Sequence, residues 1–198
     1  MAVTLPTCPY PNDYQVLLRD FGGVLTPFLG GPEQRINRIG TRFGLRVVLP
    51  SMDAGEGQTY IARLLQGRSQ TVILPFPIFD LETTGTGTPL VRTDTAGGST
   101  IPLKGMTVGY PIKEGQFFHV VHSGQRYIYM ATAATTVNGS GNADLPIFPI
   151  LRTGLTTNDV VNFETPMIEG FVSPGDDLSW QIGLDNGREI AFSVMEIA

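Results

Sequence analysis

The residue types that could bind a metal or act as acid and base are few, and their spacing suits neither task. His119 and His122 have opposite parity, so on a strand their side chains would face apart. Cys8, the single cysteine, lies far earlier in the chain, which leaves no predicted metal-ligand set. Asp176 and Asp177 are adjacent and would also diverge on a strand. The sequence therefore predicts no catalytic residue, no metal site and no cofactor.

The glycine-rich segments do not complete a known catalytic or phosphate-binding motif. Gly85-x-Gly87 lacks the third glycine and the following helix of a dinucleotide loop. The segment at 97–100 has no Walker lysine, and Gly139-Ser140-Gly141 lies in a predicted turn rather than between a strand and a helix. An enzyme is the class of protein that the sequence favours least.

Basic residues instead alternate with apolar ones in the segment from Arg38 to Val48. A period of two predicts a strand with one buried face and one solvated or interfacial face. Arg38, Arg42 and Arg46 would share the second face, and we predict that they pair with acidic groups of another subunit. Contact with DNA is the alternative, but a net charge of −5 and a pI of about 4.9 argue against a freestanding nucleic-acid-binding module.

Composition indicates a β protein with many turns. The 198 residues include 24 glycines and 15 prolines, too many for a helical bundle. Charged residues make up 16%, against about 25% in an average domain, which favours surfaces hidden in subunit interfaces. The N-terminus does not resemble a signal peptide, the single cysteine indicates a reducing compartment, and no segment approaches the roughly 20 apolar residues of a membrane span.

One helix and several hairpins are expected to position these residues. Asp53 with Glu56 resembles a capping box, and an apolar stripe follows, so a helix is predicted over about 54–66 with Gly67 as its stop. Hairpin turns are predicted at 122–124 and 185–187. The low-complexity stretch 83–89 marks a boundary. We predict a core formed by residues 1–84 and 153–198 and an inserted small β domain at 85–152.

Five short motifs follow one another along the chain: Thr26-Pro27-Phe28-Leu29-Gly30-Gly31 with Gln34, Leu49-Pro50-Ser51-Met52, Leu64-Leu65-Gln66-Gly67-Arg68, Gly115-Gln116-Phe117-Phe118, and Asn142-Ala143-Asp144-Leu145-Pro146-Ile147 with Leu151-Arg152. In this order they resemble motifs of tail proteins of long-tailed (siphovirus-like) bacteriophages, with the distal tail protein as the nearest group. Two departures are a threonine, Thr26, where the family motif has serine, and Ile39 with Phe43 where it has an aromatic pair.

The resemblance implies a mainly β fold: an antiparallel β-sandwich with one short α-helix, related to the tail-tube subunit, plus the inserted β domain. It also implies a structural virion protein of the tail, assembled in the bacterial host cytoplasm. Six copies would form a ring that joins the tail tube to the tail tip or baseplate and continues the DNA channel. The partners would be further copies, the tail-tube protein and the tail-tip hub protein. DNA would pass without specific binding, and no membrane would be involved.

Acidic residues concentrate in the last part of the chain. Residues 155–198 hold eight acidic residues and one arginine, a net charge of −7. An acidic wall would repel phosphates weakly and leave DNA mobile in the channel. The predicted channel-wall residues are Asp159, Glu164, Glu169, Asp176 and Asp177.

Two other functions remain open at this stage. The chain could be another minor tail, tail-tube or tail-completion protein, although the insertion argues against a plain tube subunit. It could also be a carbohydrate-binding module at the tail tip, since Tyr110, Phe118, Tyr127 and Tyr129 lie in the insertion. Tyr127 and Tyr129 share one strand face, which is more typical of a core than of a sugar platform.

Overall fold

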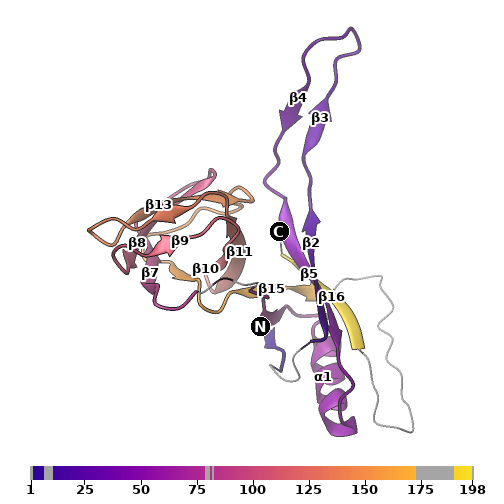
Figure 1. Cartoon of the computed structure of the whole chain (residues 1–198). Helices are drawn as coiled ribbons and strands as arrows, with labels where there is room; N and C mark the ends of the chain where they lie inside the picture. Colours follow the sequence, from indigo (N-terminus) through magenta and orange to yellow (C-terminus); the bar gives the residue numbers. More distant parts are fainter. Residues whose placement is uncertain (1, 7–10, 79–80, 82, 173–189, 198) are drawn as a thin grey trace.

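A computed structural model describes residues 2–6, 11–78, 81, 83–172 and 190–197. The described residues are mainly β with one helix, which confirms the predicted mainly β class with one short helix. A six-stranded sheet carries the helix, and a closed six-stranded barrel lies beside it (Figure 1). A long hairpin projects from the sheet away from the helix (Figure 1).

The sheet is antiparallel except at one edge, where β1 pairs in parallel with β6. The apolar side of β5 carries Phe43, Leu45, Val47 and Leu49, as the alternation in this segment predicts. In spatial order the strands are β1 (Val3–Thr4), β6 (Val72–Pro75), β15 (Met167–Val172), β16 (Ile190–Glu196), β5 (Arg42–Leu49) and β2 (Asp13–Arg19).

The helix α1 spans Ala54–Gln66, the predicted range, and packs Tyr60, Ile61 and Leu64 into the core of the sheet. The predicted capping box is wrong in one respect, because Asp53 precedes the helix but makes no side-chain cap hydrogen bond. Gly67 ends the helix with a right-handed backbone. A Cβ there would lie 2.3 Å from the side chain of Val72, so glycine is needed for close packing against β6.

The projecting hairpin, which we call the arm, comprises residues 20–41 between β2 and β5. It contains the short antiparallel pair β3 (Gly23–Leu25) and β4 (Gln34–Ile36) and the turn-rich segment between them. β5 begins at Arg42, so the predicted strand from residue 38 starts four residues too early, and Arg38 lies in the arm instead.

Antiparallel pairing of β10 with β14 closes the barrel. A two-residue turn joins β10 to β11 with Ser123 and Gly124 both at positive φ, which confirms the hairpin predicted there. In ring order the strands are β10 (Phe117–His122), β11 (Gln125–Ala131), β13 (Ala143–Phe148), β8 (Thr100–Met106), β7 (Gly87–Val91) and β14 (Val160–Asn162). Two further short strands pair with each other, β9 (Pro111–Ile112) and β12 (Thr135–Thr136).

The barrel extends past residue 152, because β14 pairs with both β10 and β7 and completes the ring. It is inserted between two neighbouring strands of the sheet, β6 and β15. The backbone N–H of Phe76 donates to the carbonyl of Pro166 at 2.8 Å, so the chain leaves and re-enters the sheet at one place.

The sheet and the barrel share a hydrophobic core rather than meeting through a linker. The ring of Phe43 in β5 lies 5.3 Å from that of Phe117 in β10 and 6.0 Å from that of Phe148 in β13. Phe76 packs on Phe117 at 4.7 Å, and the barrel residue Ile128 belongs to the core of the sheet. In the described residues, the sheet is thus covered by α1 and by one side of the barrel, not by a second sheet of a sandwich.

Candidate functional site

The arm is the most apolar exposed segment of the described chain. Phe28 and Leu29 at its tip are 102% and 94% exposed. Phe21, Val24, Leu25 and Ile39 are also exposed, so half of the large apolar side chains that the described residues expose lie in this one hairpin. Exposed apolar surface gathered in one place is typical of a protein–protein contact.

The face of the sheet opposite α1 is basic. On β5 the side chains of Arg42 and Arg46 alternate with the buried apolar positions and therefore share this face, as predicted. Arg46 is exposed and lies across from Gln15 of β2 and Ser193 of β16. Arg38 does not join them, because it lies outside the strand.

A pocket of about 410 Å³ opens on this face near the base of the arm, and we call it the arm-base pocket. It brings together two arginines that the sequence did not group with Arg42, one from β2 and one that follows α1. The lining residues are Arg19, Arg42, Arg68, Phe171, Val172, Met195, Glu196 and Ile197.

Within the pocket, two cations face each other. Arg19 and Arg42 are directly opposite in the β2–β5 pair, an arrangement that destabilises a sheet when both side chains are charged. Both guanidinium groups lie over the ring of Phe21, at 5.8 and 5.4 Å from its centroid. Burial lowers the pKa of Arg42, and the charges of Arg19 and Arg152 lower it further.

Below the pocket, a buried ion pair connects the sheet to the barrel. The carboxylate of Glu196 pairs with Arg152 and accepts a hydrogen bond from the backbone N–H of Ile128 at 2.7 Å. The Arg152 guanidinium also donates to the carbonyl of Ile197 at 3.1 Å and lies over the ring of Tyr127. Burial raises the pKa of the Glu196 carboxyl to about 7, although the pairing with Arg152 opposes this shift.

A second carboxylate of the sheet, that of Glu169 in β15, binds the same barrel strand, β11. Glu169 accepts hydrogen bonds from the backbone N–H and the guanidinium of Arg126 at 3.2 and 3.3 Å, and from the hydroxyl of Thr71 at 3.1 Å. β13 pairs with β11 only at Met130 and Ala131. The two carboxylates therefore satisfy backbone N–H groups of β11 that no neighbouring strand reaches.

His119 makes a third polar contact at this junction. Its Nδ1 accepts the backbone N–H of Met167, the first residue of β15, at 3.1 Å. Burial and, to a smaller extent, the charge of Arg126 lower the pKa of His119 to about 4. The imidazole is therefore neutral at physiological pH, as an acceptor at Nδ1 requires.

The predicted channel-wall residues have partners within the chain. Glu169 is 5% exposed and forms the ion pair just described, which differs from the exposed position that a channel wall needs. Glu164 is exposed and accepts the backbone N–H of Gly85 at 3.2 Å. Asp159 is half-buried, and Asp176 and Asp177 lie outside the described residues.

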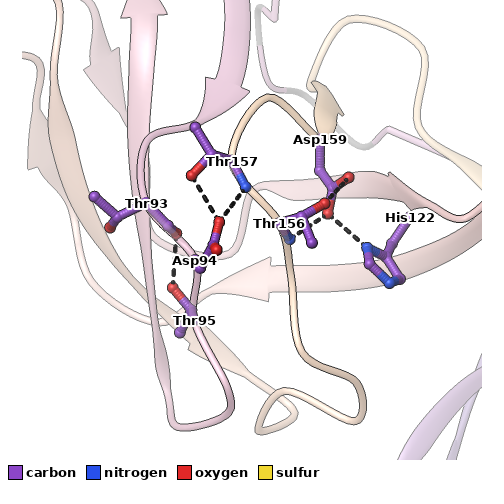
Figure 2. Close-up of polar contacts among 7 residues, drawn as sticks. All are labelled: Thr93, Asp94, Thr95, His122, Thr156, Thr157 and Asp159. Carbon is purple, nitrogen blue, oxygen red and sulfur yellow. Dashed lines mark hydrogen bonds and ion pairs between the residues drawn. The ribbon is translucent and has the colours of Figure 1, made fainter.

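Asp159 lies in a polar cluster at one end of the barrel (Figure 2). Its carboxylate is 2.7 Å from Nδ1 of His122 and accepts the backbone N–H and hydroxyl of Thr156 at 2.7 and 2.9 Å. Asp94 accepts the backbone N–H and hydroxyl of Thr157, both at 2.7 Å. Burial would raise the pKa of Asp159, but hydrogen bonds from Thr156 and His122 outweigh it and lower this pKa.

This cluster is not arranged as a nucleophilic relay. In such a relay the hydroxyl binds the imidazole, whereas here Thr156 and His122 both bind the carboxylate of Asp159. Both carboxylates instead fix residues 156 and 157 in the loop that leads to β14 (Figure 2).

The aromatic residues of the insertion do not form an exposed platform. Phe118 and Tyr129 are fully buried and Tyr127 is 9% exposed, all within the barrel core. Tyr110 packs against the same core. The sharing of one face by Tyr127 and Tyr129 is thus explained by core packing.

Neither the contacts between sheet and barrel nor the arm-base pocket was predicted from the sequence, although the position of Glu196 indicated a buried partner. Ile190, Phe192 and Val194 alternate as inward residues, and Glu196 continues the same parity. A carboxylate at an inward position indicates a buried partner. The apolar residues of the arm were hidden by the glycines and prolines around them.

No protein-family model matches the chain, and no curated protein sequence matches it. Among the residues that the structure describes, no helix is long and apolar enough to cross a membrane. Within the same residues, no three His, Cys, Asp or Glu side chains gather where they could hold a metal ion.

Proposed function

We propose that this protein is a ring-forming structural protein of a phage tail, of the distal tail type. Six copies would join the tail tube to the tail tip and continue the DNA channel. The observation that carries the proposal is the presence of two exposed surfaces on one chain, an apolar arm and a basic sheet face. A subunit of a permanent assembly exposes such surfaces before it assembles, whereas monomeric proteins rarely expose a large contiguous apolar patch.

The geometry of the two surfaces supports a ring rather than a two-fold dimer. The arm points away from the sheet (Figure 1), and the arm-base pocket, lined by Arg19 and Arg42, lies where the arm begins. Two different surfaces that complement each other make a heterologous contact, and such a contact closes into a ring when its rotation allows. The order of the sequence motifs supports the distal tail position.

The barrel supports the proposal by its attachment. It is inserted between β6 and β15, shares a core with the sheet and is held by two carboxylates and a neutral histidine. An element joined this firmly moves with the ring body. We propose that it is displayed from the ring, where it can contact neighbouring tail components such as the tail-tube or hub protein.

The experiment is native mass spectrometry of the full chain over a range of concentrations, together with cryo-EM of tails that contain it. The expected result is a closed assembly of six copies, with one ring per tail. A protein that occurs in tails as a two-fold dimer, or that is absent from tails, would contradict the proposal.

The proposal that acidic residues of this ring line the DNA channel has a separate test. Among the described wall residues Glu164 is the exposed one, and Asp176 and Asp177, outside the described residues, are tested with it. Changing Glu164, Asp176 and Asp177 to lysine is expected to leave assembly intact and to slow DNA ejection most at low salt, because salt screens such charges within about 10 Å. Ejection at the normal rate from all such particles would contradict the assignment of these residues to the wall.

A further inference from the structure

The arm-base pocket has an apolar floor and a cationic rim. Phe171, Val172 and Met195 supply the floor, and Phe171 remains 42% exposed there. Arg19 and Arg68 are exposed at the rim. A volume of about 410 Å³ is within the range of specific ligand pockets, which hold roughly 300–1,000 Å³.

The positive charge of this rim is not balanced within the described chain. No ion pair joins Arg19, Arg42 or Arg68 to a carboxylate of the described residues, and the Glu196 carboxylate is already paired with Arg152. In addition, Nε of Arg42 is buried without a hydrogen-bond partner there. An anionic group from outside would relieve the opposition of Arg19 and Arg42.

The tip of the arm has the complementary chemistry. Phe28 and Leu29 are almost fully exposed to solvent. Glu33, an exposed carboxylate, lies in the same loop directly before β4. The loop is held by a turn in which the N–H of Gly30 donates to the carbonyl of Pro27 at 3.2 Å. One compact turn thus presents an apolar pair together with a negative charge.

We infer that the arm tip of one copy inserts into the arm-base pocket of a second copy, with Phe28 and Leu29 on the apolar floor and Glu33 among the arginines. This inference rests on the proposed ring and specifies which surfaces of neighbouring copies meet in it. The arm of the same copy cannot make it, because the arm projects away from the sheet (Figure 1) and its tip is about ten extended residues, or roughly 30 Å by the rise of a strand, from its base. Repeating the contact from copy to copy is head-to-tail and can close a ring.

The sharpest test mixes two defective variants. A tip variant carries Phe28→Asp and Leu29→Asp, and a pocket variant carries Arg19→Glu and Arg68→Glu; all four positions are exposed, so each variant should fold. Each variant alone is expected to stay monomeric. Their equimolar mixture is expected to give a dimer and nothing larger, because one intact pocket meets one intact tip. Circular dichroism checks that both variants fold.

A cross-linking test does not depend on ring formation. One chain carries Cys8→Ser with Phe28→Cys, the other carries Cys8→Ser with Phe171→Cys, and mild oxidation is expected to join the two chains. Val108→Cys in place of Phe171→Cys is the matched control, since Val108 is an exposed apolar residue of the barrel and should not cross-link.

The outcomes separate the contact from the function. If the natural protein forms six-fold rings and both variants do so equally well, or the specific cross-link is no stronger than the control, the contact is overturned while the proposed function stands. If the cross-link forms but tails contain no ring of this protein, the contact stands and the proposed function fails.

Discussion

Glu196 lies between two regions, the barrel–sheet junction, formed by the ion pairs Arg152–Glu196 and Arg126–Glu169, and the arm-base pocket. The two regions differ in whether their arginines have a carboxylate partner within the chain. At the junction, Arg152 and Arg126 each have a buried carboxylate, in Glu196 and Glu169. At the pocket, Arg19 and Arg42 face each other without one. Charges that are paired within the chain hold the fold together, whereas charges left unpaired at an apolar pocket indicate a surface meant for another molecule.

Glu196 shows how closely the two regions adjoin. Its Oε1 binds Arg152 and the N–H of Ile128, while its Oε2 is buried without a hydrogen-bond partner among the described residues. The same residue lines the pocket. Substitutions can therefore test whether stability depends on the junction and association on the pocket and arm.

The largest loss of stability is expected from Phe43→Ala. This ring joins the cores of the sheet and the barrel, so its removal should lower the free energy of unfolding by about 3–5 kcal/mol. Phe171→Ala in the pocket is the matched control, because a partly exposed ring should cost less than about 1.5 kcal/mol. Urea unfolding measures both, and equal losses would contradict the distinction.

Arg152→Ala is expected to lower the free energy of unfolding by about 3 kcal/mol at pH 8, because it leaves Glu196 buried and charged. The pairing with Arg152 lowers the pKa of Glu196, which burial raises to about 7, so in the variant this pKa lies above 7. The loss should therefore shrink as the pH falls towards 7, because the carboxyl of the folded variant takes up a proton before that of the natural protein. Arg92→Ala removes an exposed pair with Asp144 and should cost under about 1 kcal/mol at either pH.

A smaller effect is expected from the neutral histidine of the junction. The pKa of His119 is lowered to about 4 in the folded state, so the unfolded state gains a proton first and stability falls as the pH drops from 6.5 towards 4. His119→Asn keeps an acceptor for the N–H of Met167 and removes this titration. Between pH 7 and 5 the natural protein should therefore lose about 1–2 kcal/mol more than the variant. Parallel pH dependence of the two would contradict the assignment.

The smallest effect on folding is expected at the arm tip. Phe28→Ser with Leu29→Ser should change the free energy of unfolding by no more than about 0.5 kcal/mol, because both side chains are exposed in the single chain. The same pair should weaken association strongly. A loss of stability as large as that of Phe43→Ala, measured at a concentration where the protein is monomeric, would show that the arm is part of the fold.

Local patterns predicted the local elements and missed the long-range ones. The apolar stripe with Gly67 predicted α1, the turn at Ser123 and Gly124 predicted the β10–β11 hairpin, and alternation predicted the faces of β5. Closure of the barrel was missed because β14 has three residues and pairs with strands far away in sequence. No period or turn signal encodes such a pairing.

The functional surfaces follow the same rule. Alternation placed Arg42 and Arg46 on one outward face, but Arg19 and Arg68 join Arg42 only because β2, β5 and the end of α1 come together. Asp159 and Glu169 were predicted from charge alone as wall residues. Their internal partners, His122 and Arg126, could not be inferred because charge counts do not record which side chains meet.

The hydrogen bond between Phe76 and Pro166 has a consequence for the order of folding. These residues are about 90 positions apart, and closing a flexible loop of that length costs roughly 4 kcal/mol of chain entropy. A barrel that folds first replaces the flexible loop with a rigid body whose two ends already lie together. β6 and β15 then meet as if joined by a short turn, so their pairing costs much less chain entropy once the barrel has closed. A variant whose barrel closes slowly is therefore expected to pair β6 with β15 slowly as well.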